Sequence, residues 1–351
     1  MPTGLRRSRQ TIRTTEHGFT LIELLVVVSI ISLLIGILLP SLSQALRIAR
    51  STICSTTQRQ LMQGMITYAM ENDDAIPGIG TSGYGIMERA RGVTGDCASA
   101  LQFANRRITP VQNFDWITPS VNPDDLPIER AARFEFILNN FACPSNTTRV
   151  IVWPGGDCGR QDMEEYIETR AEDLPIGPSY LMNANWGMAG PRPGDLGWPV
   201  IRQSAYSFTS PVRMPESYRP RINAVGNPSR KAAFGDGFRY LTADGVVDID
   251  ASIAPQFWGA FSDSSPVFMQ SRSYGTAQTN DNTQGRNLPL SYRHNMTMNA
   301  AFFDGHVANL TMDQSRDPSL WFPAGSRLTP SNNNQIHPSV LEKYQPGDYF
   351  E

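Results

Sequence analysis

The chain has 351 residues, a formal net charge of −3 and a pI of about 5.9. Its sequence has no basic patch and no alternation of aromatic with basic residues, so we expect no nucleic-acid partner. Neither His-Glu-x-x-His nor Gly-x-Ser-x-Gly occurs, and we therefore expect no enzymatic activity. Glycine (28) and proline (26) are frequent, which predicts a globular part that is rich in loops.

A basic segment, residues 1–18, precedes an apolar run from Phe19 to Leu39. A helix of this length spans about 31 Å, close to the thickness of the hydrocarbon core of a bilayer. Glu23 is the one acidic residue inside the run. A carboxylate in lipid is costly and therefore indicates a function.

Two ordinary interpretations of the run are a cleaved secretory signal and a plain membrane anchor. A secretory signal needs a shorter apolar core followed by a small-x-small cleavage site, and residues 38–42 (Leu-Leu-Pro-Ser-Leu) provide none. A plain anchor explains the length of the run but explains neither Gly18 nor Glu23.

Residues 18–25, Gly-Phe-Thr-Leu-Ile-Glu-Leu-Leu, resemble the prepilin motif of type IV pilins and of type II secretion pseudopilins. The resemblance implies that prepilin peptidase cuts between Gly18 and Phe19 and that the new amine of Phe19 is methylated. Glu23 then becomes the fifth mature residue, and Pro40 lies where many pilins also carry proline.

The physics of the membrane supports this resemblance. Cleavage creates a cationic amine at Phe19 near the anionic Glu23, and Glu23 of an incoming subunit can pair with the Phe19 amine of its neighbour. The alternative is a protonated or hydrated Glu23 at the membrane surface.

The arginines around the run favour a cytoplasmic N-terminus and a periplasmic head, in an inner-membrane protein with a single span. A filament would carry the head outside the cell. The arginines before the run are Arg6, Arg7, Arg9 and Arg13, and those soon after it are Arg47 and Arg50.

Beyond Pro40, an apolar stripe predicts that the helix continues to Met70, with its end at residues 71–74 before Pro77 and Gly78. Pro40 can bend or locally melt it. The stripe that we expect under the head comprises Leu42, Leu46, Ala49, Ile53, Leu61, Met65 and Ala69.

The rest of the chain predicts a β-rich head at residues 76–330 and a polar, peripheral tail at residues 331–351. We expect a short helix at residues 131–139 and strands at 149–153 and 231–234. Asp236, in Gly-Asp-Gly, is expected to shape a turn rather than to catalyse a reaction. Five tryptophans are expected to fill the core or to line loops: Trp153, Trp186, Trp198, Trp258 and Trp321.

Residues 297–311 predict a β-hairpin, because Asp304-Gly305 separates two β-prone runs and suits a type I′ turn. His294 with Asp304-Gly305 resembles the His-x9-Asp-Gly signature of a bacterial family with prepilin-type N-termini. Residues 143–145 (Cys-Pro-Ser) and 179–183 (Ser-Tyr-Leu-Met-Asn) resemble two further segments of that family. The resemblance implies an α+β, pilin-like fold, in which a long N-terminal helix packs on a small antiparallel sheet with large loop insertions.

His294 and Asp304 could also form a metal or acid–base pair, but a structural role in the hairpin is the simpler interpretation. Calcium binding is a further alternative, because some pseudopilins bind it through oxygen ligands. Asp281, Asp304 and Asp313 are available for it, yet their spacing is not that of an EF-hand, and we expect no cofactor.

Four cysteines permit two disulfides in an exported head, in three possible connectivities. We favour Cys97 with Cys158, and Cys54 with Cys143, of which the second would tie the helix to the head.

We expect a structural subunit whose partners are prepilin peptidase, other pilin or pseudopilin subunits and the inner membrane. The alternative is a membrane- or filament-borne extracellular module that binds a polymer or an envelope protein. A membrane-anchored enzyme is a third hypothesis, without a complete catalytic motif.

Overall fold

The chain divides into two compact units, residues 1–48 and 49–351, each described here by itself. The computed structural model describes residues 19–79, 109–112, 114–153, 160–169, 174–191, 212–239, 248–253, 259–268, 271, 273–274, 284–329 and 336–351.

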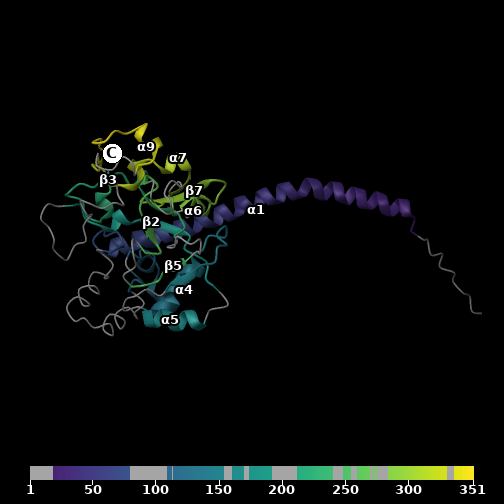
Figure 1. Ribbon diagram of the computed structural model, residues 1–351, viewed down its shortest axis with the longest axis horizontal. Coiled ribbons are helices and arrows are strands. Elements are labelled where there is room, and N and C mark those ends of the chain that lie inside the picture. Colours follow the sequence, from purple (N-terminus) through teal and green to yellow (C-terminus); the bar gives the residue numbers. More distant parts are fainter. Residues whose placement is uncertain are drawn as a thin grey trace, which may run out of the picture. The chain divides into compact units, whose positions relative to one another are not determined.

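Helix α1, Leu21–Glu71, agrees with the predicted helix to within two residues at each end (Figure 1). It is continuous through Pro40, which the sequence analysis considered a point of bending or melting. The helix ends because Asp73 and Asp74 adopt left-handed backbone angles, with φ of 54° and 61°. The Asp74 N–H then donates to the Ala69 carbonyl, which closes the last turn before Pro77 is reached.

Within the second unit, α1 buries one face in the head. The predicted Leu61, Met65 and Ala69 lie on this face, but Ala49 and Ile53 do not, because both are exposed. Leu42 and Leu46, which belong to the first unit, are exposed as well. The neighbouring Cys54 is buried in its place. The buried residues of α1 are Cys54, Gln58, Leu61, Met62, Met65 and Ala69, at the 3.6-residue spacing of one helix face.

The main sheet of the head has five strands in the order β6-β2-β4-β7-β8. β2 pairs antiparallel with β4, β4 with β7 and β7 with β8, whereas β2 and β6 are parallel. The strands are β2 (Tyr180–Asn183), β4 (Ala232–Asp236), β6 (Ser262–Asp263), β7 (Thr297–Phe302) and β8 (Val307–Thr311). With α1 packed against it, this sheet gives the mixed α+β, pilin-like arrangement that the sequence predicts.

The hairpin of β7 and β8 is present, but its turn differs from the predicted one. A type I′ turn needs positive φ at both central residues, and of Asp304 and Gly305 only Gly305 has it, at 93°. The Gly305 N–H donates to the Phe302 carbonyl over 2.8 Å. The connection is therefore a tight turn that ends in a left-handed glycine.

The other strands of the described residues form two smaller sheets. β1 (Ile151–Trp153) pairs parallel with β5 (Asp248–Asp250), and β3 (Val212–Arg213) pairs antiparallel with β9 (Arg327–Leu328). The predicted strand at 149–153 is thus confirmed as β1, with an isolated bridge at Arg149.

The remaining helices are shorter than α1, and the predicted helix at 131–139 is confirmed as α4. The α-helices are α4 (Arg130–Asn140), α5 (Arg160–Thr169), α6 (Gln284–Ser291), α7 (Met312–Ser315), α8 (Pro318–Trp321) and α9 (Pro338–Leu341). The 3-10 helices are η1 (Thr118–Ser120), η2 (Pro123–Asp125), η3 (Ala184–Gly187), η4 (Ile222–Ala224) and η5 (Pro228–Arg230).

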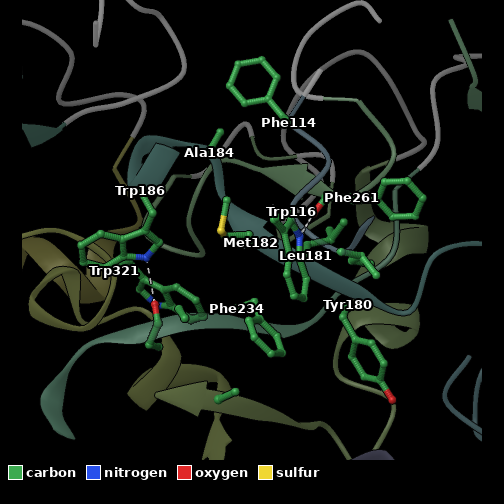
Figure 2. Packing of buried hydrophobic residues seen from close by; sticks show 14 of the residues in the cluster. Phe114, Trp116, Tyr180, Leu181, Met182, Ala184, Trp186, Phe234, Phe261 and Trp321 are labelled. Carbon is green, nitrogen blue, oxygen red and sulfur yellow. Dashed lines mark hydrogen bonds between the residues drawn. The ribbon is translucent and has the colours of Figure 1, made fainter. Parts of the chain in front are cut away.

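Aromatic side chains fill the core beside β2 and β4 (Figure 2). Trp116 stacks on Phe234 with ring centroids 4.2 Å apart, and its indole N–H donates to the Phe261 carbonyl. Trp186 and Trp321 are also buried, as expected, whereas Trp153 is 39% exposed. Trp198 and Trp258 lie outside the described residues.

The C-terminal residues 336–351, which were expected to be peripheral, pack against the head. Phe350 is buried, and its carbonyl accepts the Gly325 N–H. The ammonium of Lys231 donates to the Glu351 and Ser319 carbonyls, and burial lowers the pKa of Lys231 to about 8.

Candidate functional site

The first functional region is the start of α1, where Thr20 and Glu23 cap the helix. The carboxylate of Glu23 accepts the Thr20 N–H and hydroxyl, each over 2.8 Å. The Glu23 N–H in turn donates to the Thr20 hydroxyl over 3.2 Å. This is a capping box, which the Thr-x-x-Glu spacing could have revealed from the sequence. Phe19 is exposed, and Gly18 lies outside the described residues.

The apolar side chains that follow Glu23 are exposed along the first unit. α1 is the one helix of the described residues that is long and apolar enough to cross a membrane. An apolar surface of this size is unfavourable in water and needs lipid or other helices around it.

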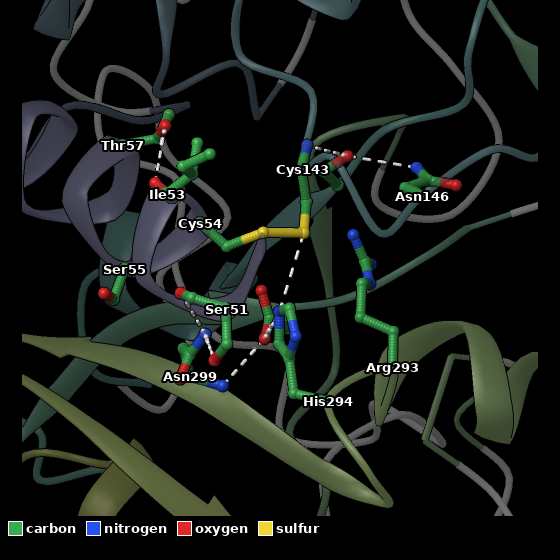
Figure 3. Close-up of a disulfide and its surroundings, with 12 residues drawn as sticks. Ser51, Ile53, Cys54, Ser55, Thr57, Cys143, Asn146, Arg293, His294 and Asn299 are labelled. Carbon is green, nitrogen blue, oxygen red and sulfur yellow. Dashed lines mark hydrogen bonds and ion pairs between the residues drawn. A yellow bond between two sulfur atoms is a disulfide. The ribbon is translucent and has the colours of Figure 1, made fainter. Parts of the chain in front are cut away.

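The second region is a buried polar cluster between α1 and the main sheet, centred on Asp236. Figure 3 shows two of its neighbours, His294 and Asn299, beside the disulfide. Asp236 is not the turn residue that the sequence analysis expected, because it is the last residue of β4 and fully buried. Its carboxylate accepts the Gln58 amide N–H over 2.9 Å and the Asn299 backbone N–H over 2.7 Å. Burial raises the pKa of Asp236 to about 6, although the Arg293 guanidinium opposes this.

His294 lies at the foot of the hairpin, where its backbone exchanges two hydrogen bonds with Thr297. Its backbone thus fixes the edge of the hairpin, as the structural interpretation expects. Its side chain is buried, with Nε2 3.4 Å from Asp236 Oδ2 and 3.5 Å from Cys143 Sγ. Burial, with help from Arg293, lowers the pKa of His294 to about 4, so the imidazole is neutral at pH 7.

Asp304 lies at the other end of β7, in the turn. It bonds to His306, with 2.6 Å between Asp304 Oδ1 and His306 Nδ1. His294 and Asp304 therefore have different partners, and Asp304 shapes the turn. Of the three calcium candidates, Asp313 pairs with Arg316 and Asp281 lies outside the described residues.

A disulfide joins Cys54 of α1 to Cys143, the pair that the sequence analysis favours for tying the helix to the head. Cys97 and Cys158 lie outside the described residues. Three segments singled out in the sequence converge here. The Cys143 N–H donates to the Ser179 hydroxyl over 2.9 Å, and the Tyr180 hydroxyl donates to the Cys54 carbonyl over 3.4 Å.

Sequence reasoning missed Gln58, Asn299 and Arg293. Gln58 carried a signal, because it interrupts the apolar face of a helix with a polar residue. Asn299 carried no such signal, because its position in a β-prone run does not reveal that its backbone N–H donates to Asp236. Among the described residues, Cys54, Cys143 and His294 bring three metal-ligand atoms within 4.8 Å of one another.

A family model described as the prokaryotic N-terminal methylation motif matches residues 13–39. The chain has a prepilin-type N-terminus. The matched segment contains Gly18, Phe19 and Glu23, and it overlaps the exposed apolar part of α1. This combination indicates a pilin-like protein that prepilin peptidase processes and that a membrane anchors. No curated protein matches the chain, and no solved structure does either.

Proposed function

We propose that the chain is a pilin-like or pseudopilin-like subunit of a filament related to type IV pili and type II secretion systems. The observation that carries this proposal is the methylation motif at residues 13–39 on a helix whose apolar side chains are exposed. Before assembly, the subunit is anchored in the inner membrane with its head in the periplasm. It then enters a filament through α1, without an enzymatic role.

In this proposal the apolar part of α1 packs first with lipid and then with the α1 helices of other subunits. Glu23 of an incoming subunit pairs with the methylated Phe19 amine of its neighbour, and removal of both charges from lipid sets the axial register. His294, Asp304 and Gly305 mark the head as one of the His-x9-Asp-Gly type, in which they frame β7 at its start and at its end.

Mass spectrometry of the membrane-extracted protein tests the proposal directly. We expect a mature N-terminus at Phe19 that carries one methyl group. Gly18→Ala should leave the leader attached while the protein still enters the membrane, and Gly36→Ala in the middle of the span is the matched control, because open space surrounds Gly36. An intact Met1 in the wild-type protein, or a cut near Ser41, would overturn the proposal.

A further inference from the structure

We propose that Cys54, Cys143, His294 and Asp236 form a tetrahedral Zn²⁺ site when the Cys54–Cys143 disulfide is reduced. The inference goes beyond the filament role and does not depend on it. It rests on the positions of side chains that come from two elements and two loops: α1, β4, the loop after α4, and the loop between α6 and β7. Cys54, Cys143 and His294 bring their ligand atoms within 4.8 Å of one another (Figure 3), and Asp236 lies next to His294.

Two distances from His294 Nε2 match those of a zinc coordination shell. Zinc binds nitrogen at about 2.0–2.1 Å, sulfur at about 2.3 Å and carboxylate oxygen at about 2.0–2.2 Å. In a tetrahedral site these bond lengths place the nitrogen about 3.5 Å from a sulfur and about 3.4 Å from a carboxylate oxygen. The observed separations are 3.5 Å from His294 Nε2 to Cys143 Sγ and 3.4 Å to Asp236 Oδ2. After reduction the two sulfurs are free to separate, and completion of the site requires that the metal draw them and the Asp236 carboxylate together.

The donor types also suit zinc. Two thiolates, a neutral imidazole and a carboxylate are all ligands that zinc accepts, and thiolates disfavour calcium and magnesium. The carboxylate is already held in place, because Gln58 donates to Asp236 Oδ1 while the Asn299 backbone donates to Oδ2. Such outer hydrogen bonds orient ligands at known metal sites.

The charge of the surroundings fits both states. With the disulfide closed, the positive charge of Arg293 acts on the negative charge of the Asp236 carboxylate. Two thiolates and Zn²⁺ add no net charge to this pair. Nη1 of Arg293 is buried and has no hydrogen-bond partner in the described part of the chain. The positive charge of Arg293 therefore balances the one negative charge left after zinc neutralises the two thiolates, which is that of Asp236.

The two states exclude each other because they use the same sulfur atoms. A thiol reductant transfers two electrons and two protons to the disulfide and becomes a disulfide itself. Zn²⁺ then displaces the two thiol protons to water and binds the thiolates. In the reverse direction a disulfide oxidant accepts two electrons from the two thiolates and is reduced to thiols, which restores the Cys54–Cys143 bond and releases Zn²⁺.

The test uses the full-length protein in detergent, with Cys97→Ser and Cys158→Ser so that Cys54 and Cys143 are the only thiols. After reduction we add Co²⁺ as a spectroscopic substitute for Zn²⁺. We expect one Co²⁺ per chain, with intense tetrahedral d–d bands, thiolate-to-cobalt charge transfer and full displacement by Zn²⁺. The oxidised protein should show none of these bands.

Variants separate this site from adventitious binding. His294→Gln should weaken Co²⁺ binding by more than the roughly 10- to 100-fold that loss of an outer hydrogen bond costs, and Gln58→Leu should fall within that range. His306→Gln, which changes the exposed imidazole of the same hairpin, should bind Co²⁺ as the parent does.

Two results would overturn the proposal. One is a reduced, folded protein that binds no Co²⁺, or that binds it equally well after His294→Gln. The other applies if the head unfolds on reduction. Because metal binding and folding are coupled, Zn²⁺ should then restore the near-ultraviolet circular dichroism of the head, and failure to restore it rejects the site.

Discussion

At the scale of single residues, Gln58 shows how one polar side chain joins the helix to the sheet. It is fully buried on the apolar face of α1, and its amide donates to Asp236 of β4 and to the Asn299 carbonyl of β7. These bonds connect three segments that are far apart in the sequence. A buried carboxylate is costly without donors, so Gln58 makes the ionised Asp236 tolerable in the core.

We expect Gln58→Leu to lower the free energy of unfolding by about 1–3 kcal/mol, because it removes the donor to Asp236 Oδ1 and leaves that oxygen buried. Gln63→Leu on the exposed face of α1 is the matched control and should change it by less than about 0.5 kcal/mol. Denaturant unfolding of both proteins in the same detergent gives the comparison. Equal effects of the two substitutions would reject the role assigned to Gln58.

Asp236 also shows where sequence reasoning stops at the residue scale. Gly-Asp-Gly is typical of a turn, and local turn chemistry predicts one there. The structure instead continues β4 through Asp236, because partners at residues 58 and 299 satisfy its carboxylate. No local pattern contains those partners, so only the fold reveals this role.

At the scale of elements, Gly64 sets how closely α1 approaches η1. A Cβ atom built on Gly64 would lie 1.8 Å from the backbone oxygen of Ser120, a contact that backbone atoms cannot relieve by a rotamer change. The absence of a side chain here therefore fixes the distance between the helix and the head.

Gly64→Ala should destabilise the head by about 1–3 kcal/mol or more through overpacking, although alanine is the better helix former by about 1 kcal/mol. Gly36→Ala is the control on the same helix, where nothing lies within 4 Å of the added atom. Thermal unfolding of the two variants in detergent should give a lower midpoint for Gly64→Ala only. A raised midpoint for Gly64→Ala would contradict the close approach.

Helix α9 contributes a pH-dependent cap. Nδ1 of His337 accepts the Ser339 N–H over 3.2 Å. Burial, and the nearby Arg316, lower the pKa of His337 to about 4 from an ordinary value of 6.5. The unfolded chain therefore takes up a proton before the folded one as the pH falls. The stability that this group contributes is complete above pH 6.5 and is lost progressively towards pH 4.

His337→Asn should keep the cap but remove its titration, since asparagine is a good N-cap residue. We expect the variant to gain stability relative to the wild type as the pH is lowered from 7 to 5. Unfolding midpoints at several pH values measure the difference. Parallel curves for the two proteins would show that His337 does not titrate as expected.

The elements that the sequence predicted well are those with a strong local period. The long helix, α4 and the β7–β8 hairpin follow from apolar spacing and turn residues within a short window. The predicted face of α1 was wrong at its N-terminal positions as far as Ile53, which are exposed, and Cys54 occupies the first buried position. The packing of residues 336–351 against the head was not predicted, because isolated apolar residues such as Phe350 form no periodic pattern in the sequence.

At the scale of the whole molecule, the start of α1 has two roles that can be separated. The Thr20–Glu23 capping box needs only a hydrogen-bonding side chain at position 23, and glutamine also serves there. Pairing with the Phe19 amine of another subunit needs a negative charge. Glu23→Gln therefore removes the charge and keeps the cap, whereas Glu23→Ala removes both.

If charge pairing sets the register of the filament, Glu23→Gln and Glu23→Ala should both enter the membrane, lose the leader and fail to join filaments. Thr20→Val, which removes the capping hydroxyl but keeps the carboxylate, should assemble. Glu71→Gln at the far end of α1 is the charge control and should assemble as the wild type does, because Glu71 is exposed there. Cross-linking and shear fractionation of cells that express each variant measure incorporation. Normal assembly of Glu23→Gln together with failure of Thr20→Val would assign the role of Glu23 to the helix cap instead of to the contact between subunits.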